Sequence, residues 1–312
     1  MAPACNQHMR KCCRASERGF ILVAVLLVST LFLGAAVSFA LFARYEAARV
    51  SAEEFAAVTR GLAMLALKEA SEAIVIDDGP SDSRSEPIYS GKPIELDFSD
   101  FTAQVTIEPL DGHIPINGLL LPDGVTIKNE YAYPWMLALG ALGIEHLAPV
   151  ILDFIDADII PRAGSREPDD FPNRRLSDLS ELLRLPEITG GVLYSNGESP
   201  ALGDFFTAYG DSGININVTP GWVLAILDPG LDADTAGRIV ESRAENAITG
   251  PDDLVKISGI SQTLITRLKN VINYKSIYFR VHIEVAGRGG RRNFEITVRR
   301  EQDGCSVINW RE

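Results

Sequence analysis

The sequence contains little cysteine or histidine, and acidic side chains outnumber basic ones. Only four of the 312 residues are cysteine and four are histidine. So few cysteines exclude a disulfide-stabilised scaffold. The histidines are spread along the chain and share no metal-binding spacing. Lysine and arginine number 29 against 42 acidic residues, for a formal charge of −13. That balance argues against a general nucleic-acid binder, which needs a basic face to displace counterions from phosphate.

Motifs for catalysis and phosphate binding are also absent. The sequence has no Gly-x-Ser-x-Gly motif and no Gly-Lys-Ser/Thr phosphate loop. Residues 287–290 are rich in glycine, but they lie between two alternating apolar segments and therefore predict a hairpin turn. Cys305 lies in an apolar strand-like segment, where a core position is favoured over a nucleophile. We therefore expect a protein that is not an enzyme.

A long run without charge dominates the N-terminal part. Residues 20–43 include no charged side chain, and as a helix they would extend about 36 Å, enough to cross a bilayer core. Four basic residues precede the run, which predicts a cytoplasmic N-terminus and an exported body. The alternative is a cleaved signal peptide ending near Gly34-Ala35-Ala36. The run is longer than the apolar part of such peptides, which favours a retained transmembrane helix.

The helical pattern continues beyond the apolar run. Residues 44–76 carry apolar side chains at intervals of three to five and contain no proline, and Asp77-Asp78-Gly79-Pro80 ends the pattern. Alternating apolar residues predict strands at 98–108, 277–285, 294–298 and 305–310. Strands at both ends of the exported part, with a helical pattern between them, predict an α+β fold in which one antiparallel sheet is interrupted by an insertion.

The middle of the chain contains an internal repeat. Ile114-Pro115-Ile116-Asn117 is matched by Ile214-Asn215-Ile216-Asn217, and Trp135-Met136-Leu137 by Trp222-Val223-Leu224. Residues 181–189 are matched by residues 253–261. The matched segments follow the same order in both copies, but they lie closer together in the second copy. This order predicts a duplicated helical unit. The extra length of the first copy lies mainly at 121–133 and 156–176.

The N-terminal segment resembles a type IV prepilin. Arg18-Gly19 is followed by Phe20, an apolar run and a long helix, as at prepilin cleavage sites. The resemblance implies that a prepilin peptidase cuts between Gly19 and Phe20 and methylates the new N-terminus. Most pilins have glutamate at the fifth mature residue, where this chain has Ala24. That departure resembles the K-type minor pseudopilins of the type II secretion system.

The resemblance to this family covers most of residues 18–300. The family's two helical lobes, which interrupt a pilin-like sheet, match the repeat described above. The resemblance implies a structural subunit at the tip of the pseudopilus that helps to start pseudopilus assembly and protein export. It implies a single-pass protein of the bacterial inner membrane with a periplasmic C-terminal domain. The implied partners are the I- and J-type minor pseudopilins, the inner-membrane secretion platform and prepilin peptidase. The expected parts are a leader (1–19), a pilin helix (20–76), the first part of the core (77–113), a two-lobed helical insertion (114–272) and C-terminal core strands (273–312).

An acidic segment in the first copy is the candidate metal site. Six carboxylates lie between residues 153 and 170 among prolines and a glycine, and hard oxygen ligands on a loop suit Ca²⁺. Members of the resembled family can carry calcium in this lobe. The resemblance implies Asp156, Asp158, Glu167 and Asp169 as ligands. The alternative is a solvated acidic loop whose carboxylates cap helices.

Two other functions remain open from the residues. Ile257-Ser258-Gly259-Ile260 resembles a helix-hairpin-helix, which would suit a membrane-tethered DNA receptor of the competence type. Residues 230–272 carry a net charge of −1, however, which favours packing over phosphate binding. A membrane-anchored hydrolase that uses the aspartate cluster with a metal is the third hypothesis. The lack of a histidine ligand or a nucleophile motif counts against it.

Overall fold

The computed structural model describes residues 8–166, 168, 171–197, 199–210 and 213–312. The chain divides into two compact units, Met1–Gly61 and Leu62–Glu312. The first unit is formed by most of a single long helix, α1 (His8–Ile76), whose C-terminal end belongs to the second unit. Within the described residues, the second unit contains all the strands and the remaining helices.

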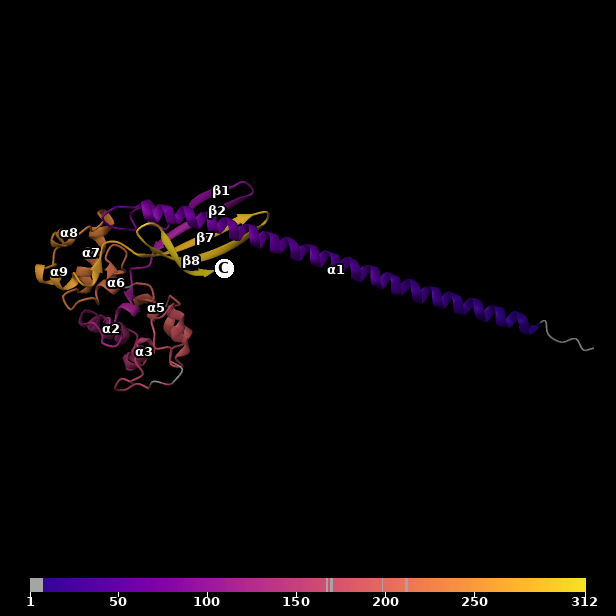
Figure 1. The fold of residues 1–312 in the computed structure, drawn as a ribbon, viewed down its shortest axis with the longest axis horizontal. Coiled ribbons are helices and arrows are strands. Elements are labelled where there is room, and N and C mark those ends of the chain that lie inside the picture. The colour runs from indigo at the N-terminus through magenta and orange to yellow at the C-terminus, as the bar shows by residue number, and fades with distance from the viewer. Residues whose placement is uncertain (1–7, 167, 169–170, 198, 211–212) are drawn as a thin grey trace, which may run out of the picture. The chain divides into compact units, whose positions relative to one another are not determined.

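Figure 1 shows α1 as one continuous helix, and the residues of its apolar part are exposed. Every residue from Phe20 to Tyr45 is exposed, and the most apolar window has a mean hydropathy of 2.7 with none of it buried. In length and composition this helix can cross a membrane. No proline interrupts the run, and the helix ends at Ile76, as the sequence predicts. A single apolar helix of this kind fits a single-pass membrane anchor.

The last turns of α1 bury a narrow stripe of small and aliphatic side chains within the second unit. Ala63, Ala66, Leu67, Ala70 and Ile74 are each at most 8% exposed. Their spacing of three and four residues places them on one face of the helix. The Cys305 Sγ approaches the carbonyl oxygen of Ser71 at 3.8 Å, so the last strand of the chain lies beside this helix.

The main sheet has five antiparallel strands in the order β1-β2-β7-β8-β9. Their bounds are β1 (Ile94–Phe98), β2 (Phe101–Pro109), β7 (Tyr278–Gly287), β8 (Gly290–Arg300) and β9 (Cys305–Arg311). Phe101 pairs with Gly287 and Pro109 with Phe279, so β2 and β7 are neighbours although more than 160 residues separate them. The predicted α+β fold with an interrupted antiparallel sheet is confirmed.

The prediction of one strand over 98–108 is wrong at its start. Phe98 ends β1, and a tight turn at Ser99 and Asp100 leads into β2. Ser99 adopts a positive φ of 58°, which a sheet strand does not have. The side chains on both sides of this turn are apolar and alternate, so the sequence pattern gives no sign of the break.

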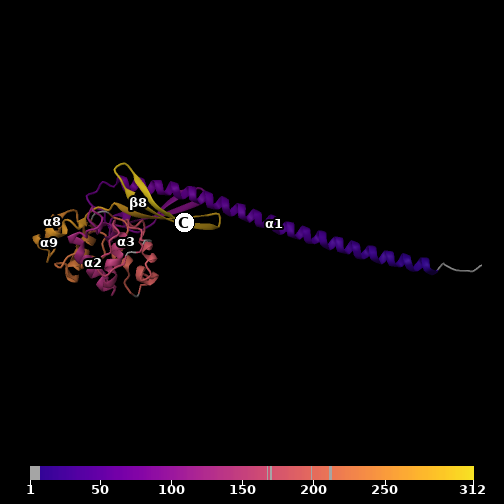
Figure 2. The ribbon, with the colours of Figure 1, turned by 60° about the horizontal axis from the view of Figure 1, so that its bottom comes forward.

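The chain between β2 and β7 folds into short helices and two small parallel strand pairs, which gather beside the sheet (Figures 1 and 2). Its helices are η2 (Ile116–Gly118), α2 (Asn129–Ala141), η3 (Glu145–Leu147), α3 (Ala148–Ile155), η4 (Leu179–Arg184), α4 (Gly190–Leu193), α5 (Leu202–Phe205), α6 (Gly221–Leu224), α7 (Ala233–Glu245), α8 (Pro251–Val255) and α9 (Gln262–Leu268). A further turn, η1 (Pro87–Tyr89), precedes the sheet.

The predicted duplication is visible in the strand pairing. β3 (Ile114–Pro115) pairs in parallel with β4 (Phe206–Thr207), which closes the first copy. β5 (Ile214–Asn215) pairs in the same sense with β6 (Ile272–Asn273), which closes the second copy. We call these two copies the first repeat and the second repeat.

An asparagine clamp recurs in both repeats. The Asn117 side chain donates to the Leu176 carbonyl at 2.8 Å and accepts from the Leu176 amide at 2.8 Å. The Asn217 side chain makes the same pair of bonds with Ile248, also at 2.8 Å each. Because an amide side chain can pair with a peptide group through both its donor and its acceptor, it holds a distant segment in a fixed register. The clamp explains why each repeat begins with an Asn-containing segment.

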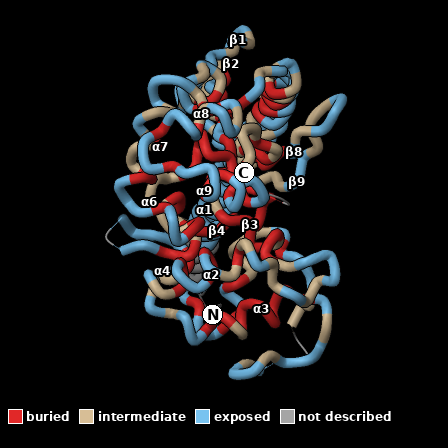
Figure 3. Tube along the Cα trace, turned by 90° about the vertical axis from the view of Figure 1, so that its left-hand side faces the viewer, coloured by how far each residue is buried: buried red, intermediate tan, exposed pale blue. Residues whose placement is uncertain are grey.

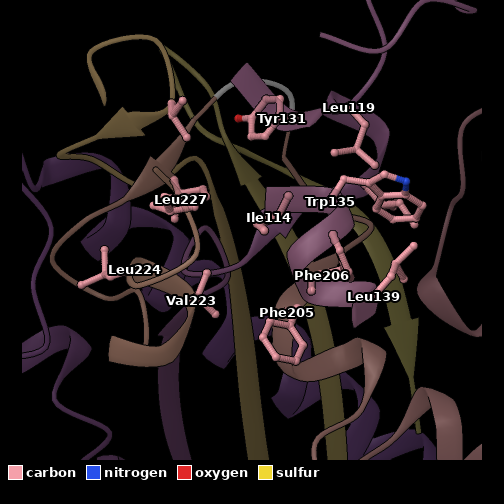
Figure 4. Close-up of a cluster of buried hydrophobic side chains, with 14 of the residues drawn as sticks. Ile114, Leu119, Tyr131, Trp135, Leu139, Phe205, Phe206, Val223, Leu224 and Leu227 are labelled. Carbon is pink, nitrogen blue, oxygen red and sulfur yellow. The ribbon is translucent and has the colours of Figure 1, made fainter. Parts of the chain in front are cut away.

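Both repeats contribute to one hydrophobic core. Figure 3 colours the buried parts of the chain red. Figure 4 shows side chains of the first repeat, such as Trp135 and Phe206, in one cluster with Val223 and Leu224 of the second. The rings of Trp135 and Phe206 meet edge to face with centroids 5.1 Å apart. The two repeats are therefore packed as one body around a shared core.

Candidate functional site

The predicted processing site lies within α1. Gly19 and Phe20 are consecutive helical residues, and Phe20 is 75% exposed. Ala24, the fifth residue after the predicted cut, lies on the same exposed apolar stretch. The exposure of Phe20 is compatible with access by a peptidase, and cleavage itself stays a prediction.

The acidic segment begins at the end of α3. Asp153 lies in the last turn of this helix and Asp156 is its C-terminal cap, and both are almost fully buried at 0% and 1% exposure. The chain then turns back so that Arg162 faces them. The Arg162 Nε lies 3.0 Å from Asp153 Oδ1, and its Nη2 lies 2.8 Å from Asp156 Oδ2. The Arg162 backbone amide donates to Asp153 Oδ2 at 2.9 Å.

Burial and the charge of Arg162 act in opposite directions on the pKa of Asp156 in this cluster. Burial raises the pKa of Asp156 to about 6, against the opposing hydrogen bond and charge of Arg162. The contact between Arg162 Nε and Asp153 Oδ1 is close enough for an ion pair, but its angle does not make a hydrogen bond. Buried charges of this kind are stable in a fold only when they are paired.

Among the other predicted calcium ligands, only Asp158 belongs to the described residues, and it forms no metal site with the two buried aspartates. Asp158 directs its Oδ1 to the amide of Ile160, at 2.9 Å, and so caps its own loop. Glu167 and Asp169 lie outside the described residues. Among the described residues, no three His, Cys, Asp or Glu side chains gather as a metal site. Asp156 and Asp158 by themselves do not fit a calcium ion, and the full four-residue site stays a prediction.

The hairpin of the second repeat is used for packing. The Arg238 Nε donates to the Ser258 carbonyl at 2.7 Å, and a Cβ on Gly259 would collide with the Arg238 guanidinium. Gly259 has a φ of +87°, so a residue without a side chain is needed there. An arginine therefore covers the turn that would face phosphate in a DNA-binding hairpin.

Three further cations of this repeat also contact groups of the same repeat. Arg267 makes two hydrogen bonds to Asp228 at 2.7 Å, and Lys256 contacts Asp253 at 2.8 Å. Arg243 donates to the Ile216 carbonyl in a half-buried position, and burial lowers its pKa to about 10. These contacts give no support to the DNA-receptor hypothesis, because these cations already bind carboxylates or a carbonyl of the repeat itself.

A buried polar junction between the sheet and the repeats was missed by the sequence analysis. Asp82 is fully buried and accepts hydrogen bonds from the Arg300 guanidinium, the nearest at 3.0 Å, and from the Ser276 amide at 2.6 Å. Asp111 accepts from the amides of Ile277 and Tyr278 at 2.7 and 2.8 Å. Burial raises the pKa of Asp111 to about 7. The partners are up to 218 residues apart, so no local pattern indicates this junction.

A groove of about 850 Å³ runs beside α9 and β6. Its polar side chains include Gln262, Thr266, Tyr274, Lys269 and Lys275, and the rest of its lining is largely isoleucine and proline. The described lining has no carboxylate, histidine or cysteine, so this groove offers no acid–base pair or nucleophile for catalysis.

The fold is that of a pilin-like α+β protein with a long apolar N-terminal helix. No protein-family model matches the sequence, and no curated protein matches it. A chain in the crystal structure of the GspK-GspI-GspJ complex from the Type 2 Secretion System of enterotoxigenic Escherichia coli has a similar structure, with a TM-score of 0.59 and 15% sequence identity. The match covers 84% of this chain and 98% of that chain. It confirms the predicted resemblance to a minor pseudopilin at the level of the fold.

Proposed function

We propose that this chain is a K-type minor pseudopilin of a type II secretion system. The observation that carries the proposal is the combination of an exposed apolar helix with an interrupted five-stranded sheet and a duplicated helical insertion. The structural match to a chain of the GspK-GspI-GspJ complex, which covers 84% of this chain and 98% of that chain, supports the proposal. The role is structural, and no catalytic step is assigned to it.

The subunit would enter the pseudopilus after removal of its leader. Prepilin peptidase would cut between Gly19 and Phe20 on the cytoplasmic side, and the apolar helix would hold the mature protein in the inner membrane. The basic residues before Phe20 support this orientation. The helix could then leave the bilayer and pack among the helices of other pseudopilins, where its apolar surface would again be covered.

The bulk of the insertion supports a position at the tip. The chain between β2 and β7 adds two repeats beside the sheet, and a subunit stacked directly above would have to displace them. Ala24 supports the same position, because a subunit without the usual carboxylate lacks a partner for a neighbour's N-terminal amine. The I- and J-type minor pseudopilins are the partners proposed for the tip, with the inner-membrane platform below.

The test is the N-terminal mass of the protein extracted from membranes. Cleavage predicts a mature chain that starts at methylated Phe20 and stays in the membrane fraction. A Gly19→Val variant should retain its leader. A Gly34→Val variant should be processed normally, because Gly34 has open space around it in the same helix. A mature chain that starts after residue 36 and is freely soluble would contradict the proposal.

Partner assignment needs a separate measurement. Co-expression with I- and J-type minor pseudopilins should allow the three proteins to be purified together from detergent extracts. A monodisperse chain that never associates with either partner would leave the fold assignment intact but would contradict the tip role.

A further inference from the structure

The cluster around Arg162 joins the two segments that make the first repeat longer than the second. The first segment is the turn at 121–127, where Leu121 and Thr126 are joined by backbone hydrogen bonding. The second segment starts at Asp156 and turns back through residues 161–164. The Arg162 side chain lies between the two segments and the end of α3.

The guanidinium of Arg162 contacts oxygen atoms from three places in the chain. It lies 3.0 Å from Asp153 Oδ1 and 2.8 Å from Asp156 Oδ2, and its Nη2 also donates to the Val125 carbonyl at 2.6 Å. Two carboxylates and one backbone carbonyl are the oxygen ligands that proteins offer to hard cations such as Ca²⁺. Here they converge on a side chain that carries its own fixed positive charge.

We propose that the Arg162 guanidinium takes the place of a metal ion in the first repeat. It holds the two long loops against α3. A calcium ion takes six to eight oxygens, whereas the guanidinium contacts three, the Val125 carbonyl and Asp156 Oδ2 by hydrogen bonds and Asp153 Oδ1 by charge alone. Arg162 is itself only 25% exposed, and both aspartates are buried, so solvent screens these contacts weakly. The first repeat is therefore built to be stable without calcium.

Charge counting makes this inference testable. Two aspartates face one arginine, so the cluster keeps one negative charge in excess, and Asp153 Oδ1 and Asp156 Oδ1 have no hydrogen-bond partner in the described structure. Loss of the arginine would leave two buried carboxylates facing one another. These carboxylates would then be available to an added divalent cation.

The experiment is thermal unfolding of the full-length chain in detergent micelles, with excess chelator or with millimolar calcium chloride. The wild-type midpoint should be the same in both to within about 1 °C, whereas a site saturated a hundredfold above its Kd would raise it by roughly 5–10 °C. Calcium-dependent stabilisation of the wild type would overturn the proposal.

Variants test the role of the side chain itself. Arg162→Met should lower the midpoint by roughly 10 °C in chelator, because it leaves two buried carboxylates unpaired. Calcium should restore part of that loss. Arg166→Met removes an exposed pair with Glu187 from the same loop and should change the midpoint by about 2 °C or less. An Arg162→Met protein as stable as the wild type, or one that calcium leaves unchanged, contradicts the inference.

A further variant covers the case in which Arg162→Met does not fold. The triple substitution Asp153→Asn, Asp156→Asn and Arg162→Met removes all three charges together. It should fold, unfold at a higher temperature than the single variant, and show no response to calcium. A triple variant that still requires calcium would place the metal elsewhere and would overturn the proposal.

Discussion

The first and second repeats share a hydrogen-bonded frame but are stabilised by different ion pairs. Both begin with an Asn clamp and close with a parallel strand pair. The first repeat then adds long loops that are held by a buried ionic cluster. The second repeat keeps its ion pairs nearer the surface, as the exposures of 49% for Arg267 and 9% for Asp228 indicate. Duplication thus fixes the hydrogen-bonded frame, while the added loops need their own source of stability.

The tryptophans give the sharpest contrast between the repeats. Trp135 and Trp222 are matched in sequence, but Trp135 is 1% exposed and Trp222 is 58% exposed. Trp135→Ala should lower the free energy of unfolding by about 4 kcal/mol, because it leaves a cavity in the shared core. Trp222→Ala should cost less than about 1 kcal/mol. Denaturant unfolding of both variants measures the difference, and equal losses would show that the environments of the two residues are in fact alike.

A pH titration tests the junction where the chain enters the first repeat. The pKa of Asp111 is raised to about 7 by burial, so folding favours its protonated form. Its contribution to stability is present at pH below about 4 and is lost as the pH rises through 7, by roughly 4 kcal/mol. Asp82 and Arg300 face the same junction, and their charges act on Asp111 in opposite directions.

The control for this titration is Asp111→Asn, which keeps an oxygen acceptor for the amides of Ile277 and Tyr278 but removes the charge. The stability of this variant should vary less between pH 5 and pH 8 than that of the wild type. An unchanged pH dependence would mean that other groups are responsible, and the assignment to Asp111 would fail.

The Asn clamps occupy equivalent positions in the two repeats, so a substitution at each one compares the repeats directly. Asn217 is 2% exposed, whereas Asn117 is only half-buried. Asn217→Ala should lower the free energy of unfolding by about 2–3 kcal/mol, because it leaves the Ile248 peptide group unpaired in the interior. Asn117→Ala should cost about 1–2 kcal/mol, since water can reach part of its site. A larger loss at Asn117 would show that the loops of the first repeat depend on this clamp more than burial indicates.

The sequence predicted features that repeat or alternate, and it missed those that depend on distant contacts. The apolar run from Phe20, the helix end at Ile76 and the order of repeated segments are local signals, and each matches the structure. At the Arg162 cluster the sequence shows only several acidic residues near two arginines. It does not show which side chains meet, because the direction of a loop side chain depends on the final fold. The Asp82–Arg300 pair joins residues 218 apart and has no local signal.

The smallest expected effect concerns the surface ion pair of the second repeat. Arg267 donates two hydrogen bonds to Asp228 at 2.7 Å, but its side chain is 49% exposed. Arg267→Met should therefore lower the free energy of unfolding by about 1 kcal/mol, and high salt should shrink the difference from the wild type. The loss at Arg162 should persist in high salt, because its partners are buried. Equal salt sensitivity at the two arginines would show that the repeats use the same kind of ion pair, and the contrast between them would disappear.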